Sequence, residues 1–179
     1  MSSIEVLAVI GIIGYIIFRQ VQGEHLRGKR VVVLPLVLTV IGFTDLHGRG
    51  GAAMTHADIA CIAVGAVGSA LIGVLFGVMM RLESRGGRLW AQLPVRGLWL
   101  WGALIAWRVV TEMIATGAHA EVAASSATLL FGLGINRLAQ AAVVVPRALA
   151  AGIPFAPEKD GKTFMSGAFE QRGAGRWDR

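Results

Sequence analysis

The sequence predicts an all-α membrane protein, a bundle of five transmembrane helices with its N-terminus outside and its C-terminus in the cytoplasm. Hydrophobic residues make up 55% of the 179 residues and charged residues only 16%, whereas a soluble domain carries about 25% charged residues. The apolar residues gather in five separate runs, and the basic residues gather in alternate connections between them. We therefore expect residues 1–151 to form one transmembrane domain, followed by a cytoplasmic tail over 152–179.

The distribution of basic residues sets the expected orientation. If each apolar run crosses the bilayer, Arg49 is the only basic residue of the connections that falls on one of the two sides. The opposite side carries Arg19, Arg27, Lys29, Arg30, Arg81, Arg85, Arg88, Arg96, Arg147 and the basic residues of the tail. Because cytoplasmic loops hold the excess of Lys and Arg, this side is predicted to be cytoplasmic and to face anionic lipid headgroups. The sequence has no nucleic-acid-binding motif, so we expect no nucleic-acid partner.

The first two predicted helices cover residues 3–20 and 31–46. No Lys or Arg precedes the first apolar run, so it is interpreted as a retained helix and not as a cleaved signal peptide. The second run is short, with Pro35 early in it, and falls under the usual minimum of about 17 residues for a span. The charge pattern requires a crossing there, and a re-entrant segment is the alternative.

The third predicted helix, residues 58–80, carries small residues at four successive i, i+4 positions, namely Gly65, Ser69, Gly73 and Gly77. Such residues line one helix face and let a neighbouring backbone approach closely. We expect this face to pack against another helix of the same chain, and a pore lining or ligand groove is the alternative. The single cysteine, Cys61, lies in the same helix and excludes an intrachain disulfide.

A short cytoplasmic hairpin is predicted between the third and fourth helices. Polar and apolar residues partly alternate on both sides of Gly86 and Gly87, and a Gly-Gly pair suits a two-residue hairpin turn. An unstructured basic loop is the alternative. Trp90, Trp99 and Trp101 surround the entry to the next helix, where we expect them to anchor the chain at the headgroup level.

The fourth and fifth predicted helices, residues 97–116 and 121–147, are joined by a very short connection and are therefore expected to be antiparallel neighbours. The tail from residue 152 contains Gly, Pro and charges of both signs without apolar periodicity. This composition is typical of a disordered segment.

Ionisable residues inside the predicted helices are the main functional candidates, because each costs about 2.5–3.5 kcal/mol at a helix centre. Arg108 and Glu112 lie one turn apart, a spacing that allows an ion pair. Arg137, beside Asn136 in the fifth helix, is a further possible contact for Glu112. A structural cluster that fixes helix register is the simpler interpretation. The alternative is a ligand site made by Arg108, Glu112, Asn136 and Arg137, in which two guanidinium groups and one carboxylate leave positive charge for an anionic group.

No pattern in the chain predicts catalysis or a cofactor. His47, His56 and His119 fall on the outer side with Asp45, Asp58 and Glu121. Together they offer metal or haem ligands, but loop histidines without tight ligand spacing are usually solvated. The sequence contains no phosphate-binding loop, no His-Glu-x-x-His and no Gly-x-Ser-x-Gly. We therefore expect that the protein has no enzymatic activity, no metal site and no cofactor.

The order of several motifs resembles the CcdC-like family of small bacterial integral membrane proteins over residues 4–147. The motifs are Arg19-Gln20, Gly28-Lys29-Arg30 before Leu34-Pro35, the glycine-stepped third helix, Arg81 with Glu83, Gly87-Arg88-Leu89-Trp90, Leu98-Trp99-Leu100 and the intramembrane Arg108. The resemblance implies a multi-helix plasma-membrane protein. The family is named for a gene-neighbourhood association with cytochrome c biogenesis and implies no residue roles, and the single Cys61 disfavours thiol redox chemistry.

Heavy use of Arg over Lys, with abundant Ala, Gly and Val, is typical of a bacterium with a GC-rich genome. We therefore expect a multi-pass protein of the bacterial plasma membrane. The expected function is that of a non-enzymatic accessory or assembly factor acting with other membrane proteins. The alternative is a small carrier or binding protein for an anionic or lipid-like ligand that uses the intramembrane Arg and Glu residues.

Overall fold

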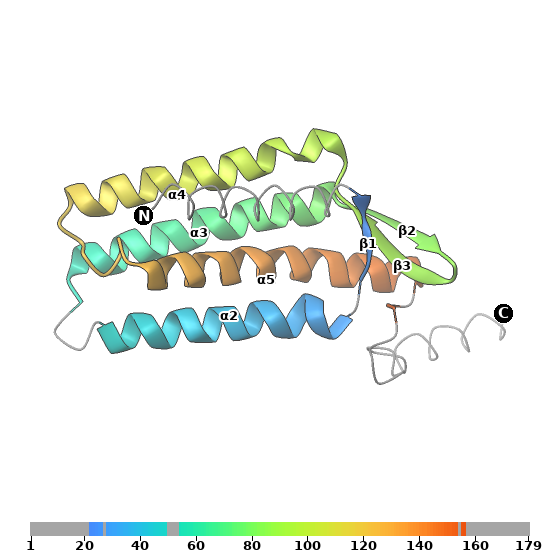
Figure 1. Cartoon of the computed structure of the whole chain (residues 1–179), viewed down its shortest axis with the longest axis horizontal. Coiled ribbons are helices and arrows are strands. Elements are labelled where there is room, and N and C mark those ends of the chain that lie inside the picture. The colour runs from blue at the N-terminus through green and yellow to red at the C-terminus, as the bar shows by residue number, and fades with distance from the viewer. Residues whose placement is uncertain (1–21, 27, 50–53, 154, 157–179) are drawn as a thin grey trace, which may run out of the picture.

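The computed structural model describes residues 22–26, 28–49, 54–153 and 155–156, and in these ranges four long helices lie side by side with a small sheet at one end (Figure 1). The helices are α2 (Gly28–Arg49), α3 (His56–Met79), α4 (Trp99–Gly117) and α5 (Ser126–Ala151). All four are long and apolar enough to cross a membrane. The predicted helix at 3–20 lies outside the described residues, as does the predicted disordered tail beyond residue 156. The count of five helices and the state of the tail stay predictions.

α2 is longer than the sequence pattern predicted. It begins three residues before and ends three residues after the expected range of 31–46 and continues through Pro35. Thr39 lies one turn after Pro35, and its Oγ1 donates a hydrogen bond of 2.8 Å to the Pro35 carbonyl oxygen. Because the helix is continuous over 22 residues, the shortness that favoured a re-entrant segment is absent.

α5 is the central helix of the bundle. It lies between α2 and α3, and α4 packs on the other side of α3 (Figure 1). Glycines make both α5 contacts close: an added Cβ at Gly73 of α3 would overlap the Asn136 carbonyl oxygen, and one at Gly134 of α5 would overlap Thr39 of α2. Small residues therefore let α5 approach two neighbours at backbone distance.

The small-residue face of α3 divides into two parts. Ser69, Gly73 and Gly77 meet α5, which is a helix of the same chain. Gly65 does not, because no atom lies within 4 Å of where its Cβ would be. Its carbonyl oxygen instead accepts a hydrogen bond of 3.2 Å from Trp107 Nε1 of α4. The part of the face from Ser69 to Gly77 thus packs against α5, whereas the space beside Gly65 is open.

Large apolar side chains cover the outside of the bundle. Phe43 on α2 is 59% exposed, Leu71 on α3 is 61% exposed and Met113 on α4 is 69% exposed, and many of their outward neighbours are similar. A soluble monomer rarely exposes a contiguous apolar surface of this extent. Together with the helix lengths, this surface indicates a multi-pass membrane protein.

The predicted hairpin is present. β2 (Arg81–Arg85) and β3 (Arg88–Gln92) pair antiparallel, and Gly86 and Gly87 between them have φ values of 60° and 70°. Both turn residues thus take the positive φ that a tight hairpin of this type requires. Sequence reasoning missed β1 (Glu24–His25), which is two residues long and pairs with β3 to give the order β1-β3-β2. Leu89 of β3 packs on Ala148 of α5, so the sheet covers that end of the bundle.

At the opposite end, Asp58 joins α3 to the connection between α4 and α5. Thr55 caps α3, and Thr55 and Asp58 form a reciprocal capping box. The second carboxylate oxygen, Asp58 Oδ1, accepts hydrogen bonds from the Val122 and Ala123 amides at 3.1 and 3.0 Å. These contacts hold the connection in turns, so α5 begins at Ser126. The predicted start at residue 121 and the very short connection were therefore wrong.

Most of the described basic residues lie at the sheet end, together with the acidic Glu83; they are Lys29, Arg81, Arg85, Arg88, Arg96 and Arg147. Asp45, Asp58 and Glu121 lie toward the other end. Arg147 Nη1 donates to the carbonyl oxygens of Gly77, Val78 and Met80 and so satisfies the last turn of α3.

Candidate functional site: an apolar pocket with one guanidinium

The candidate site is a cavity of about 320 Å³ between α3, α4 and α5. It forms because α4 packs mainly on α3, which leaves the space between α4 and α5 partly unfilled. Its walls are mostly apolar, and Gly65 of α3 and Gly132 of α5 add to its width. The lining residues are Ile62, Gly65, Ala66, Ser69, Trp101, Leu104, Ile105, Trp107, Arg108, Val109, Thr111, Thr128, Leu129, Phe131, Gly132 and Leu133.

Arg108 is the one ionisable residue among the described residues that line this pocket. Its Nε lies 3.7 Å from a carboxylate oxygen of Glu112, so the i, i+4 pair predicted from the spacing is present. Its Nη2 donates a long hydrogen bond of 3.4 Å to the Ser125 carbonyl oxygen. The Nε atom is buried and has no hydrogen-bond partner in the described part of the chain. A guanidinium group has five N–H donors, so most of the donor capacity of Arg108 is unused.

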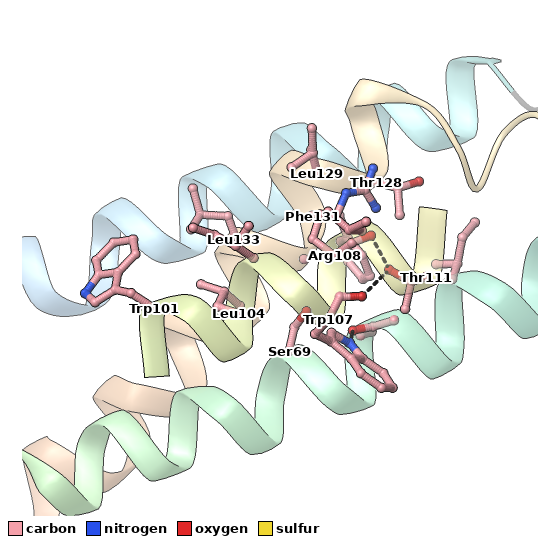
Figure 2. Close-up of a pocket in the computed structure, with 16 residues that line it drawn as sticks. Ser69, Trp101, Leu104, Trp107, Arg108, Thr111, Thr128, Leu129, Phe131 and Leu133 are labelled. Carbon is pink, nitrogen blue, oxygen red and sulfur yellow. Dashed lines mark hydrogen bonds between the residues drawn. The ribbon is translucent and has the colours of Figure 1, made fainter. Parts of the chain in front are cut away.

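Two polar residues of the lining, Thr111 and Thr128, accompany Arg108 at its end of the pocket, and Ser125 contacts Arg108 from outside the lining. The Thr111 hydroxyl donates to the Trp107 or the Arg108 carbonyl oxygen, both at 3.0 Å, and the Thr128 hydroxyl donates to the Val122 carbonyl oxygen at 3.1 Å. Ser125 Oγ is buried and has no hydrogen-bond partner among the described residues. Figure 2 shows this polar end around Arg108, Thr111 and Thr128, with Leu104 and Leu133 lying between it and Trp101.

The pocket opens toward the apolar surface of the bundle. Ile105 and Val109 on α4 are 51% and 50% exposed, and Leu129 on α5 is 49% exposed, although all three line the cavity. An apolar molecule therefore has a path into the cavity between α4 and α5. In a bilayer that path starts in the hydrocarbon, not in water.

Asn136 and Arg137 lie elsewhere in the bundle. Asn136 is fully buried against α3, where its Nδ2 donates to the Ser69 carbonyl oxygen at 2.8 Å and its Oδ1 has no partner in the described ranges. Arg137 Nη1 donates to Gln140 Oε1 at 2.8 Å, and its guanidinium lies 5.4 Å from the centre of the Trp101 ring. This second polar group is held by hydrogen bonds and a cation–π contact.

The structure does not bring Arg137 to Glu112. Arg108 contacts Ser125, just before the start of α5, whereas Arg137 is eleven residues beyond Ser126 and therefore about 16 Å further along the helix axis. The Glu112 side chain is 50% exposed. Four residues predicted as one candidate cluster are thus two separate groups, because α4 leans on α3 and its acidic end lies far from the middle of α5.

His47, His56 and His119 do not gather into a metal site in the part of the chain that the structure describes. Within 22–26, 28–49, 54–153 and 155–156, no three His, Cys, Asp or Glu side chains lie close enough together to hold a metal ion. His47, His56 and His119 are exposed, and the Asp58 carboxylate accepts hydrogen bonds from the chain itself.

Sequence reasoning missed the residues that complete the pocket. Trp107 and Thr128 carry no motif, and they line the pocket because α4 packs on α3 beside α5. Gly68, one residue before Ser69, is a further small residue of α3, and the structure shows why: an added Cβ there would overlap the Trp107 ring. The small residues of α3 therefore serve two neighbours, α5 through Gly73 and α4 through Gly68.

Comparisons of the chain with protein-family models, curated proteins and solved structures found no match. The resemblance to the CcdC-like family stays a prediction from the sequence.

Proposed function

We propose that this chain is a multi-pass protein of the bacterial plasma membrane that binds a lipid-like anion, a molecule with an apolar chain and a negatively charged head, between α3, α4 and α5. One observation carries the proposal: the wall of an apolar cavity holds a single guanidinium group whose donors are mostly unused. A cation inside membrane helices is costly unless a partner compensates it. Glu112 does so only in part, at 3.7 Å and half exposed.

The size and shape of the cavity support a small ligand. A cavity of about 150 Å³ holds a benzene molecule, so a cavity of about 320 Å³ has room for one apolar chain but not for a two-chain phospholipid. The wall is apolar apart from Ser69 and the Arg108 end, as in most pockets for small molecules.

The proposal is for binding and not for catalysis. The described residues that line the pocket include no His, Cys, Asp, Glu or Lys that would act as base or nucleophile beside Arg108. The protons of the Thr111 and Thr128 hydroxyls are already donated to backbone carbonyl oxygens.

A bromine-labelled fatty acid tests the proposal, because bromine quenches tryptophan fluorescence on contact and Trp101 and Trp107 line the pocket. With the protein in lipid nanodiscs, we expect saturable quenching that unlabelled fatty acid reverses. Trp107→Phe should remove a large part of the signal. Gly65→Leu should abolish saturable quenching, because the leucine side chain would fill the open space beside Gly65.

The matched control for charge is Arg96→Gln, which removes an exposed guanidinium outside the pocket and should leave quenching unchanged. Failure of every fatty acid to bind would overturn the proposal. Equal quenching in the wild-type protein and in Gly65→Leu would overturn it as well.

The role of an accessory or assembly factor is a second candidate, favoured by the basic hairpin. Arg81, Arg85 and Arg88 are all exposed at the sheet end, and among them Arg85 pairs with Glu83 at 3.1 Å. Such a surface suits an acidic partner or anionic headgroups. Co-purification from mild detergent should recover a partner with the wild-type protein but not with the double variant Arg81→Ser and Arg88→Ser. Recovery of the protein alone in several detergents would contradict this role.

A further inference from the structure

We infer that the ligand of the α3–α4–α5 pocket is a single-chain monocarboxylate, bound with its carboxylate at Arg108 and its chain running toward Trp101. This inference rests on the proposed function and specifies the charge, the number of chains and the direction of the ligand. Three features of the pocket carry it: its charge balance, its supply of hydrogen-bond donors and its gradient of polarity.

The charge balance disfavours a head with two negative charges. Arg108 supplies one positive charge, and Glu112, at 3.7 Å and half exposed, offsets part of it. The next cation along the bundle interior, Arg137, lies about 16 Å further along the axis of α5, beyond effective reach of the same headgroup. A phosphate monoester carries between one and two negative charges at neutral pH, and its second charge would meet the Glu112 carboxylate without a second cation to balance it.

The available donors also match a carboxylate. A guanidinium binds the two oxygens of a carboxylate through two parallel N–H groups. Ser125 Oγ is also buried and without a partner in the described chain, but Ser125 lies outside the pocket lining, so Arg108 is the donor that a ligand would meet. The Thr111 and Thr128 hydroxyls have already donated their protons to carbonyl oxygens. A phosphate group presents three acceptor oxygens and would leave some of them without donors.

The polarity gradient sets the direction of the chain. Arg108, Thr111 and Thr128 make one end of the cavity polar, and Leu104 and Leu133 lie between that end and Trp101 (Figure 2). Ser69 is the other polar residue of the lining, and the Arg137 guanidinium, which is not part of the lining, lies 5.4 Å from the centre of the Trp101 ring. Trp101 lies seven residues before Arg108 on the same helix, which corresponds to about 10 Å along the axis. The carboxylate would therefore sit in the half of the bundle away from the sheet, and the chain would point toward the sheet end.

Three probes with the same chain separate these features: dodecanoate, dodecyl phosphate and dodecanol, each competing with the bromine-labelled fatty acid in nanodiscs. Nanodiscs without protein correct for partition into lipid. We expect the wild-type protein to prefer dodecanoate to both others by about tenfold, the scale of one hydrogen-bonded charge pair. Arg108→Gln should remove the preference for dodecanoate over dodecanol while dodecanol still competes.

Glu112→Gln is the matched variant for the charge balance, because it removes one negative charge with almost no change in shape. It should raise the affinity for dodecyl phosphate relative to dodecanoate several-fold. Equal or tighter binding of dodecyl phosphate to the wild-type protein would overturn the inference, and so would an unchanged ratio in Glu112→Gln. In either case, saturable binding that Gly65→Leu abolishes would still support the proposed function. Absence of binding by all three probes would contradict both the proposed function and the inference about the ligand.

Discussion

At the scale of single residues, three polar side chains hold the ends and the middle of an apolar bundle. Arg147 satisfies the carbonyl oxygens at the end of α3, Asn136 ties α5 to the Ser69 carbonyl oxygen, and Asp58 accepts from three backbone amides and one hydroxyl. Each side chain bonds to backbone groups that a membrane interior cannot hydrate. Of the three, Asp58 makes the largest number of hydrogen bonds, four through its carboxylate.

Replacement of Asp58 by Ala should destabilise the protein by about 2–4 kcal/mol, because a capping box is lost and two loop amides lose their acceptor. Asp58→Asn keeps one acceptor oxygen and should cost less. Unfolding in mixed micelles with increasing denaturing detergent measures both. Glu121→Ala, an exposed carboxylate in the same connection, is the control and should change stability by no more than about 0.5 kcal/mol. Equal stabilities of Asp58→Ala and Glu121→Ala would contradict the assigned role.

At the scale of elements, periodicity and composition predicted most of what the structure describes. Three of the four described helices begin or end within about three residues of their predicted bounds, and the Gly86–Gly87 turn lies where the pattern placed it. The predicted start of α5 was too early because Val122 and Ala123 are apolar and extend the apolar run of the fifth helix. In the structure these two residues lie in turns, where their amides donate to Asp58. The sequence pattern Thr55-x-x-Asp58 is the signal that would have shown the cap of α3.

The close contact between α3 and α5 gives a second prediction. Gly73→Ala would place a methyl group against the Asn136 carbonyl oxygen and push the helices apart, at a cost of about 1–3 kcal/mol. Gly65→Ala is the matched control on the same helix face, because its methyl group meets no atom within 4 Å. The control should be neutral or more stable by up to about 1 kcal/mol, since alanine favours helix. Thermal unfolding in detergent compares the two, and a Gly73→Ala variant as stable as Gly65→Ala would contradict the packing.

At the scale of the whole molecule, the candidate site was only partly predictable. The i, i+4 spacing gave the Arg108–Glu112 pair, because that contact depends on one helix alone. The separation of Arg137 from this pair and the cavity beside Arg108 depend on how α4 leans against α3, and no local pattern encodes that angle. Trp101, expected as a headgroup anchor, packs edge-on against Phe76 and under the Arg137 guanidinium for the same reason.

The whole molecule also carries the last prediction, which concerns its orientation in the membrane. Basic residues outnumber acidic ones at the sheet end, although Glu83 lies there too, and the start of α2 and the end of α5 share that end (Figure 1). Because the side rich in Lys and Arg is retained in the cytoplasm, the hairpin should face the cytoplasm. In a Cys61→Ser background, Ser84→Cys reports on the hairpin and Glu121→Cys on the opposite end, and both positions are exposed.

A membrane-impermeant maleimide should label Glu121→Cys in intact cells and Ser84→Cys only after the cells are permeabilised. The parent Cys61→Ser protein, which has no cysteine, gives the background. The reverse labelling pattern would invert the bundle and would move the Arg108 end of the pocket from the outer to the inner half of the bilayer. Labelling of both positions in intact cells would show that the four helices do not cross the membrane as a bundle. A bundle that spans the membrane has its hairpin end and its opposite end on different sides, so only one of the two positions can be labelled from outside.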